Sequence, residues 1–268
     1  MEKALKTLGR KMNETYRYSL LSALSVVCVL GLWWAASIWN ASLAGPVDTI
    51  ERFGRLVGHP IMGVSLWMHV WASVRRIFLS FVAACVVGVS LGIAFGIFPT
   101  FKRIMWPVFS VIRPIPPLAW IPIVVLWVGI MGDTSKDIII FIGIVMAIVI
   151  NTQEGIRQTD DLLLKAGKLL GANKWQILTE ITLPSSIPAI FAGMKTGLST
   201  GWMSLVAAEM IAAKEGIGFL INQSMKNSSD TALDFIGIIL VALCSAVFTL
   251  LLNAIERKVC LWSKMRAK

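Results

Sequence analysis

Long apolar runs separated by short polar segments dominate the pattern of this 268-residue chain. The runs Tyr18–Ile38, Ile77–Phe98 and Phe235–Ile255 each meet the roughly 20 residues that a helix needs to cross a bilayer. With the weaker runs included, six spans are predicted, at about residues 18–38, 77–98, 112–131, 137–153, 186–212 and 233–255. We therefore expect an all-α, polytopic integral membrane protein.

The third and fourth spans carry the weaker signals. Four prolines interrupt the third, Pro114, Pro116, Pro117 and Pro122, and an interrupted span points to a translocation site. The strictly apolar part of the fourth, Ile138–Ile150, has 13 residues, a length that also suits a re-entrant segment.

The distribution of basic residues tests the number of spans. If the N-terminal segment 1–17 is cytoplasmic, six spans put 17 of the 25 Lys and Arg residues on the cytoplasmic side and 7 on the other, with Lys195 inside a span. This bias fits the positive-inside rule and would largely vanish if the fourth run did not cross. Both termini and the loop 154–185 are then expected in the cytoplasm, and the loops 39–76 and 213–232 on the opposite side. Arg113 is expected to anchor the cytoplasmic end of the third span.

Composition narrows the class of protein further. The chain is 56% hydrophobic and 15% charged, against roughly 25% charged residues in soluble domains. The net charge of +10 does not predict nucleic-acid binding, because the basic residues lie at the ends of apolar runs without interleaved aromatic side chains. The four cysteines and two histidines show no disulfide framework or metal-ligand spacing, so neither a metal nor a bound cofactor is predicted.

The polar loop between the fourth and fifth spans has a helix–glycine–helix pattern. Thr159 or Asp160 can cap a first helix, Gly171 breaks it, and Asn173 with Gln176 can form a capping box for a second. The pattern alone leaves two interpretations: an amphipathic helix resting on lipid headgroups, or a docking surface for a soluble partner.

A signature within this loop favours docking. The pattern Ala166-Gly167-x₃-Gly171-x₉-Ile181-x-Leu183-Pro184 resembles the EAA signature of ABC importer permease subunits, with Lys165 in place of Glu and Gly167 in place of Ala. In that family the loop is a coupling helix seated in a cleft of the ATP-hydrolysing subunit. The resemblance therefore implies that this subunit is contacted by a set of mostly small residues, Lys165, Ala166, Gly167, Gly171 and Ala172.

Further motifs resemble the taurine and aliphatic-sulfonate branch of this family, to which nitrate and bicarbonate permeases are close. They are Arg113-Pro-Ile-Pro-Pro-Leu-Ala-Trp-Ile-Pro122, Leu126-Trp-Val-Gly129, Thr134-Ser-Lys136, Gly201-Trp202-x₃-Val206-Ala-Ala-Glu209-Met-Ile-Ala212 and Gly216-Ile-Gly218-Phe219. The resemblance covers about residues 65–260, which we expect to form the permease domain. It implies the type I importer (MetI-like) architecture, in the bacterial inner membrane and surrounded by lipid.

The same resemblance implies partners. A second copy of the chain would complete the pathway, two ATP-binding cassette subunits would bind and hydrolyse ATP, and an extracytoplasmic binding protein would deliver a small anion. The chain has no GxxxxGK[ST] phosphate loop of its own, so the ATPase must be a separate subunit.

The pathway candidates come from the fifth and third spans. Lys195, Ser199, Trp202 and Glu209 recur at helical spacing along one face of the fifth span, and Trp120 lies beside the prolines of the third. Lys195 could face a path for anions or pair structurally with a carboxylate. The ladders Gly88/Gly92/Gly96 and Gly193/Gly197/Gly201 could serve static helix packing or a sliding surface, with static packing favoured.

Two rival functions are less well supported. An ion-driven secondary transporter predicts inverted repeats and paired carboxylates within the spans, whereas we find no repeat and only Glu209 near membrane depth. A membrane enzyme requires clustered His, Asp or Cys side chains at one membrane face, and the sequence shows no such cluster.

Overall fold

The computed structural model describes residues 2–40, 42–129, 132–226 and 230–260. The regular secondary structure of these residues is helical, apart from one isolated bridge between Ile61 and Val64, so the all-α prediction is confirmed. In chain order the helices are α1 (Glu2–Trp39), α2 (Pro46–Gly58), α3 (Leu66–Ile97), α4 (Pro99–Ile112), the 3-10 turn η1 (Pro117–Trp120), α5 (Ile121–Val128), α6 (Asp133–Arg157), α7 (Asp161–Leu169), α8 (Lys174–Gln176), the π-helix η2 (Ile177–Thr182), α9 (Leu183–Ala212), α10 (Ile217–Lys226) and α11 (Thr231–Val259).

The predicted spans have counterparts among these helices. Segments of α1, α3, α6, α8–α9 and α11 are each long and apolar enough to cross a bilayer, and α4 with η1–α5 is a bent pair that has the length and composition of a broken sixth span or of a re-entrant loop. The doubtful fourth run is an unbroken helix of 25 residues, about 37 Å long at 1.5 Å per residue. That length exceeds the roughly 30 Å of a hydrocarbon core, so α6 can cross it fully.

The third span differs from its prediction. It does not begin near residue 112, because a separate helix, α4, ends there, and the η1–α5 segment then leaves at an angle of 89°. Pro114, Pro116 and Pro117 explain the break, since a proline has no N–H to donate and its ring obstructs a continuing helix. Arg113 therefore lies at the break between α4 and η1, and its role as a cytoplasmic anchor stays a prediction.

The centre of the bundle is a close-packed unit of α3, α6 and α9. Both glycine ladders face α6: a Cβ built on Gly92 would lie 2.5 Å from Cβ of Thr152, and one on Gly201 would lie 2.6 Å from Cγ1 of Ile144. Such separations are too short for any side chain, so the glycines let the helix backbones approach. This geometry agrees with the static packing that the sequence analysis favoured.

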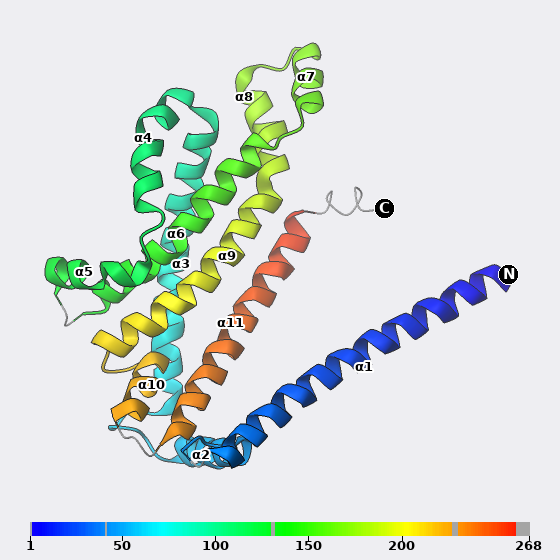
Figure 1. The fold of residues 1–268 in the computed structure, drawn as a ribbon. Helices are drawn as coiled ribbons and strands as arrows, with labels where there is room; N and C mark the ends of the chain where they lie inside the picture. The colour runs from blue at the N-terminus through cyan, green and yellow to red at the C-terminus, as the bar shows by residue number, and fades with distance from the viewer. Residues whose placement is uncertain (1, 41, 130–131, 227–229, 261–268) are drawn as a thin grey trace.

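The two ends of the bundle differ in what they carry (Figure 1). The α7 end carries α7 and α8, whereas the α10 end carries α2 and α10. Helix α1 diverges from the bundle along most of its length and contacts it near α2. There Trp33 packs on Phe235 of α11 with ring centroids 4.7 Å apart.

Candidate functional site

A short helix, α7, lies outside the spans at the α7 end (Figure 1). The carboxylate of Asp160 caps it, accepting a hydrogen bond of 2.9 Å from the backbone N–H of Leu162. Leu169 and Leu170 are each 89% exposed. Since neighbouring apolar side chains seldom stay exposed on a short helix without a partner, this surface is suited to docking another molecule.

The turn after α7 follows the predicted helix–glycine–helix pattern. Gly171 has a φ of +82°, a conformation that favours glycine. The side chain of Asn173 accepts from the backbone N–H of Gln176, and the side chain of Gln176 accepts from the backbone N–H of Asn173, both at 2.9 Å. This reciprocal capping box starts α8, which continues through η2 into α9.

Helix α7 rests directly on the elbow that leads into α9. Gly167 is buried there, and a Cβ built on it would lie 2.6 Å from Cδ1 of Ile181 in η2. Of the other residues expected to contact the ATPase, Lys165, Ala166 and Gly171 are exposed and Ala172 is half-buried. The exposed members are accessible to another molecule, while Gly167 packs α7 closely against η2, which continues into α9.

The broken span forms one side of a cavity of about 390 Å³. Its walls come from the break between α4 and α5 and from the middle of α6 and α9. Most of the lining is apolar, and its polar side chains are Arg113, Trp120, Thr200 and Ser204. Trp120 is thus the one residue of the five pathway candidates that lines this cavity.

Three of the other four pathway candidates contact neighbouring helices. Nζ of Lys195 lies 2.6 Å from a carboxylate oxygen of Glu256 in α11, and Trp202 is buried edge-on against Phe248 of the same helix. Glu209 is completely buried against α3. Ser199 is exposed. The ion pair accounts for Lys195 structurally, and a pathway role for these four residues of α9 stays a prediction.

Glu209 belongs to a cluster of charges at the α10 end. Its carboxylate accepts hydrogen bonds from Oγ of Ser73, Nη1 of Arg76 and the backbone N–H of Gly218, at 2.8 to 2.9 Å. Arg76, itself buried, also contacts Asp133 of α6 at 2.8 Å. The cluster therefore joins α3, α6, α9 and the start of α10 through buried polar contacts.

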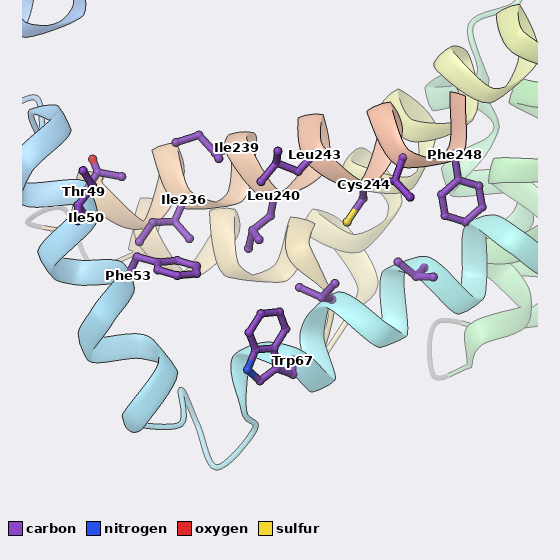
Figure 2. Close-up of a pocket in the computed structure, with 13 residues that line it drawn as sticks. Thr49, Ile50, Phe53, Trp67, Ile236, Ile239, Leu240, Leu243, Cys244 and Phe248 are labelled. Carbon is purple, nitrogen blue, oxygen red and sulfur yellow. The ribbon is translucent and has the colours of Figure 1, made fainter. Parts of the chain in front are cut away.

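The second cavity is larger, and its lining is almost entirely apolar. It has a volume of about 610 Å³ and lies between α2, α3 and α11, lined by Thr49 and otherwise by apolar side chains such as Phe53, Trp67 and Leu240 (Figure 2). An anion would find no charged side chain on these walls. Within the described residues there is no group of three His, Cys, Asp or Glu side chains that could hold a metal ion.

Comparison with known families decides what kind of protein this is. The family model for the binding-protein-dependent transport system inner membrane component matches residues 84–260, which include α6, α7, α9 and the cavity. The chain belongs to this permease family. It is therefore a multi-pass protein of the inner membrane and a component of a binding-protein-dependent transport system.

Curated relatives of this permease are similar over most of their length. It is 34% identical to the taurine transport system permease protein TauC of Escherichia coli over 92% of this chain and 90% of that one. It is 33% identical to the nitrate import permease protein NrtB of Synechocystis, over 86% and 88% of the two chains. It is 28% identical to the putative aliphatic sulfonates transport permease protein SsuC of Bacillus subtilis, over 97% and 92%.

The fold comparison agrees with the family. An inward-facing structure of the MetNI methionine ABC transporter matches with a TM-score of 0.63 and 20% identity, covering 72% of this permease and 97% of that chain. At that identity the match supports the expected MetI-like architecture and nothing finer.

Several cavity residues were missed by the sequence analysis. Thr200 and Ser204 lie four residues apart in α9, so they share one helix face. This spacing could have indicated them, but the polar face that contains Lys195 and Glu209 gave a stronger signal. Arg113 was noted only as an anchor. Its position in the cavity follows from the direction of the break, which the prolines do not specify.

Proposed function

We propose that this permease forms the transmembrane pathway of an ATP-driven ABC importer for a small anion, with taurine or another aliphatic sulfonate favoured. The anion class is supported by the taurine, sulfonate and nitrate relatives together. Taurine is favoured because the taurine permease shares 34% identity over nearly the whole chain. Nitrate, bicarbonate or another organic anion carried by the same kind of machine is the second candidate, supported by the 33% identity to a nitrate permease.

The observation that carries the proposal is the position of α7. Its exposed leucines need a partner, and Gly167 packs it against the η2 segment that continues into α9. An ATP-binding subunit that grips α7 from the cytoplasm could therefore move the elbow and α9 as one body. The proposed contacts with this subunit are Lys165, Ala166, Gly171 and Ala172. Gly167 instead packs α7 against η2.

The remaining partners follow from the same proposal. Two copies of the permease would face each other around a two-fold axis, each with one ATP-binding subunit beneath it in the cytoplasm. The α10 end would face the opposite side and receive the loaded binding protein. ATP binding would close the ATPase dimer and open the pathway outward, and hydrolysis would reset it. The permease itself performs no covalent chemistry.

The direct test is the variant Gly171→Arg. An arginine at this exposed corner should block docking, so that less of the ATP-binding subunit co-purifies and substrate-stimulated ATP hydrolysis falls at least roughly tenfold. Gly171→Ala is the matched control, since alanine must adopt the same positive φ, at a cost of about 1–2 kcal/mol, but adds little bulk. Docking of the ATP-binding subunit is not needed for insertion, so both variants should reach the membrane. Normal uptake by Gly171→Arg would refute the docking assignment.

A further inference from the structure

The cavity between α2, α3 and α11 has the shape and lining for an elongated apolar molecule. Figure 2 shows its side chains in facing rows on α11 and α3, with α2 at one end. The row on α11 runs from Ile236 to Phe248, a rise of about 18 Å along the helix. The hydroxyl of Thr49, on the wall formed by α2, already donates to the carbonyl oxygen of Gly45 at 2.8 Å. The walls therefore favour an apolar occupant over a polar solute.

The cavity opens toward the bilayer. Both α3 and α11 are long and apolar enough to cross it, and several of their side chains on the cavity walls are exposed, among them Trp67, Ile239, Leu243 and Val247. Helix α1 diverges from the bundle, and none of its described residues lines the cavity (Figure 1). The occupant must therefore come from outside this chain.

The composition of the walls favours a lipid chain over a helix of another subunit. Helices pack together in a bilayer through small residues, as the glycine ladders of α3 and α9 do against α6. None of the described residues on the cavity walls is Gly, Ala or Ser, and most are Ile, Leu, Val or aromatic residues. Such side chains keep a helix backbone at a distance, whereas a flexible acyl chain can follow the uneven surface and contact it throughout.

Helix α2 places one end of the cavity at the membrane interface. Its apolar side chains Val47, Ile50 and Val57 are exposed, and the charged Glu51 and Arg55 lie on another face of the helix. An amphipathic helix of this kind lies in the plane of the interface, with its apolar face toward the acyl chains. Because Ile50 belongs both to this face and to the cavity wall, the cavity continues the lipid-facing surface.

We propose that this cavity binds one acyl chain of a phospholipid, which enters from the leaflet at the α10 end and lies between α3 and α11. The chain supplies van der Waals contacts that the facing side chains otherwise lack, so it stabilises the arrangement of these helices. Recognition is by the chain and not by the head group, because the arginines of α2 are already in ion pairs, Arg52 with Asp230 and Arg55 with Glu51. The inference goes beyond the proposed function, since it does not depend on which molecule is transported.

The test measures the phospholipid that the permease retains with its accompanying subunits after purification in detergent, by native mass spectrometry. We expect a phospholipid on each permease chain to survive washing, and phosphatidylethanolamine and phosphatidylglycerol to replace each other equally well. Leu243→Trp should reduce this retention roughly tenfold or more, because a larger side chain inserted into a filled site costs that much binding free energy. Val74→Phe narrows the cavity from the side of α3 and should also reduce retention.

Leu250→Trp is the matched control. Leu250 is exposed to a similar extent on the same helix, 67% against 59% for Leu243, but does not line the cavity. This variant should retain phospholipid as its parent does. After delipidation, added phospholipid should raise the midpoint of thermal unfolding of the parent and of Leu250→Trp, but not that of Leu243→Trp.

A phospholipid with a diazirine in one acyl chain locates the site in the complex without any substitution. After washing and illumination, its adducts should lie on the α3 and α11 residues of the cavity. The inference is overturned by adducts elsewhere, by absent retention, by retention that depends on the head group, or by equal retention in Leu243→Trp and Leu250→Trp. Cross-linking of a Leu243→Cys variant to a second permease chain would also overturn it, because the cavity would then belong to a subunit interface.

Discussion

The charge cluster at the α10 end offers the sharpest prediction of stability. Replacing Arg76 by methionine removes the guanidinium that contacts both Glu209 and Asp133, at 2.9 and 2.8 Å. Glu209, which stays completely buried, then loses its cationic partner, whereas Asp133 keeps its ion pairs with Arg75 and Lys136. Replacing Glu209 by glutamine is milder, because Arg76 keeps Asp133.

The expected cost follows from the burial of the pair. Removing one partner of a buried ion pair destabilises a protein by about 3–5 kcal/mol. We place Glu209→Gln near the lower limit and Arg76→Met near the upper one. At roughly 2–4 °C per kcal/mol for a chain of this size, Glu209→Gln should lower the midpoint of thermal unfolding by about 6–12 °C, and Arg76→Met by more. The double variant should lose less than the sum of the two single variants.

A thiol-reactive dye can follow this unfolding in detergent. Cys28 is exposed and would react at once, so all variants are made in a Cys28→Ser background, in which half-buried Cys85 and Cys244 report the transition. Glu51→Gln is the control, since Glu51 and Arg55 form a pair at 3.6 Å with both side chains about two-thirds exposed. A pair of this kind contributes at most about 1 kcal/mol. If Arg76→Met unfolded within about 2 °C of its parent, the cluster would not stabilise the bundle as argued.

Two further predictions use the same assay. Lys195→Met should lower the free energy of unfolding by about 1–2 kcal/mol and reduce uptake, because Glu256 is left unpaired. Adding Glu256→Gln should restore both stability and uptake. Uptake that stays low in the double variant would instead indicate that Lys195 contacts the transported anion. Gly92→Val should destabilise the protein by about 3 kcal/mol or more, because the valine Cβ would lie 2.5 Å from Cβ of Thr152. Gly54→Val is the control and should cost less than about 1 kcal/mol, since nothing lies within 4 Å of a Cβ there. Equal midpoints of thermal unfolding in the two variants would contradict the packing role of the glycine ladder.

Much of the fold could be predicted because its signals are local. Apolar runs of sufficient length located the spans, and the capping box of Asn173 and Gln176 needs residues only three apart. Gly171 was predicted as a helix break and adopts a positive φ. The predicted helix–glycine–helix pattern of this loop is therefore confirmed, from the Asp160 cap to the start of α8.

The partners of the polar residues could not be predicted, because they are distant in sequence. Glu256 lies 61 residues from Lys195, and Arg76 lies 133 residues from Glu209. Helical periodicity placed Lys195 and Glu209 on one face of α9 but could not say that α11 covers one and α3 the other. The prolines predicted an interruption, yet the angle of 89° at the break, which brings Arg113 into the cavity, depends on packing against α6 and α9.

Cross-linking from α7 tests the central claim, that an ATP-binding subunit grips this helix, most directly. A cysteine introduced at Leu169, which is 89% exposed, is treated with a bifunctional maleimide in inner-membrane vesicles, in the Cys28→Ser background. We predict a covalent adduct with an ATP-binding subunit, and none from a cysteine at Met62, exposed at the opposite end. Absence of the Leu169 adduct, together with labelling of that cysteine by an impermeant thiol reagent from outside intact cells, would contradict the account.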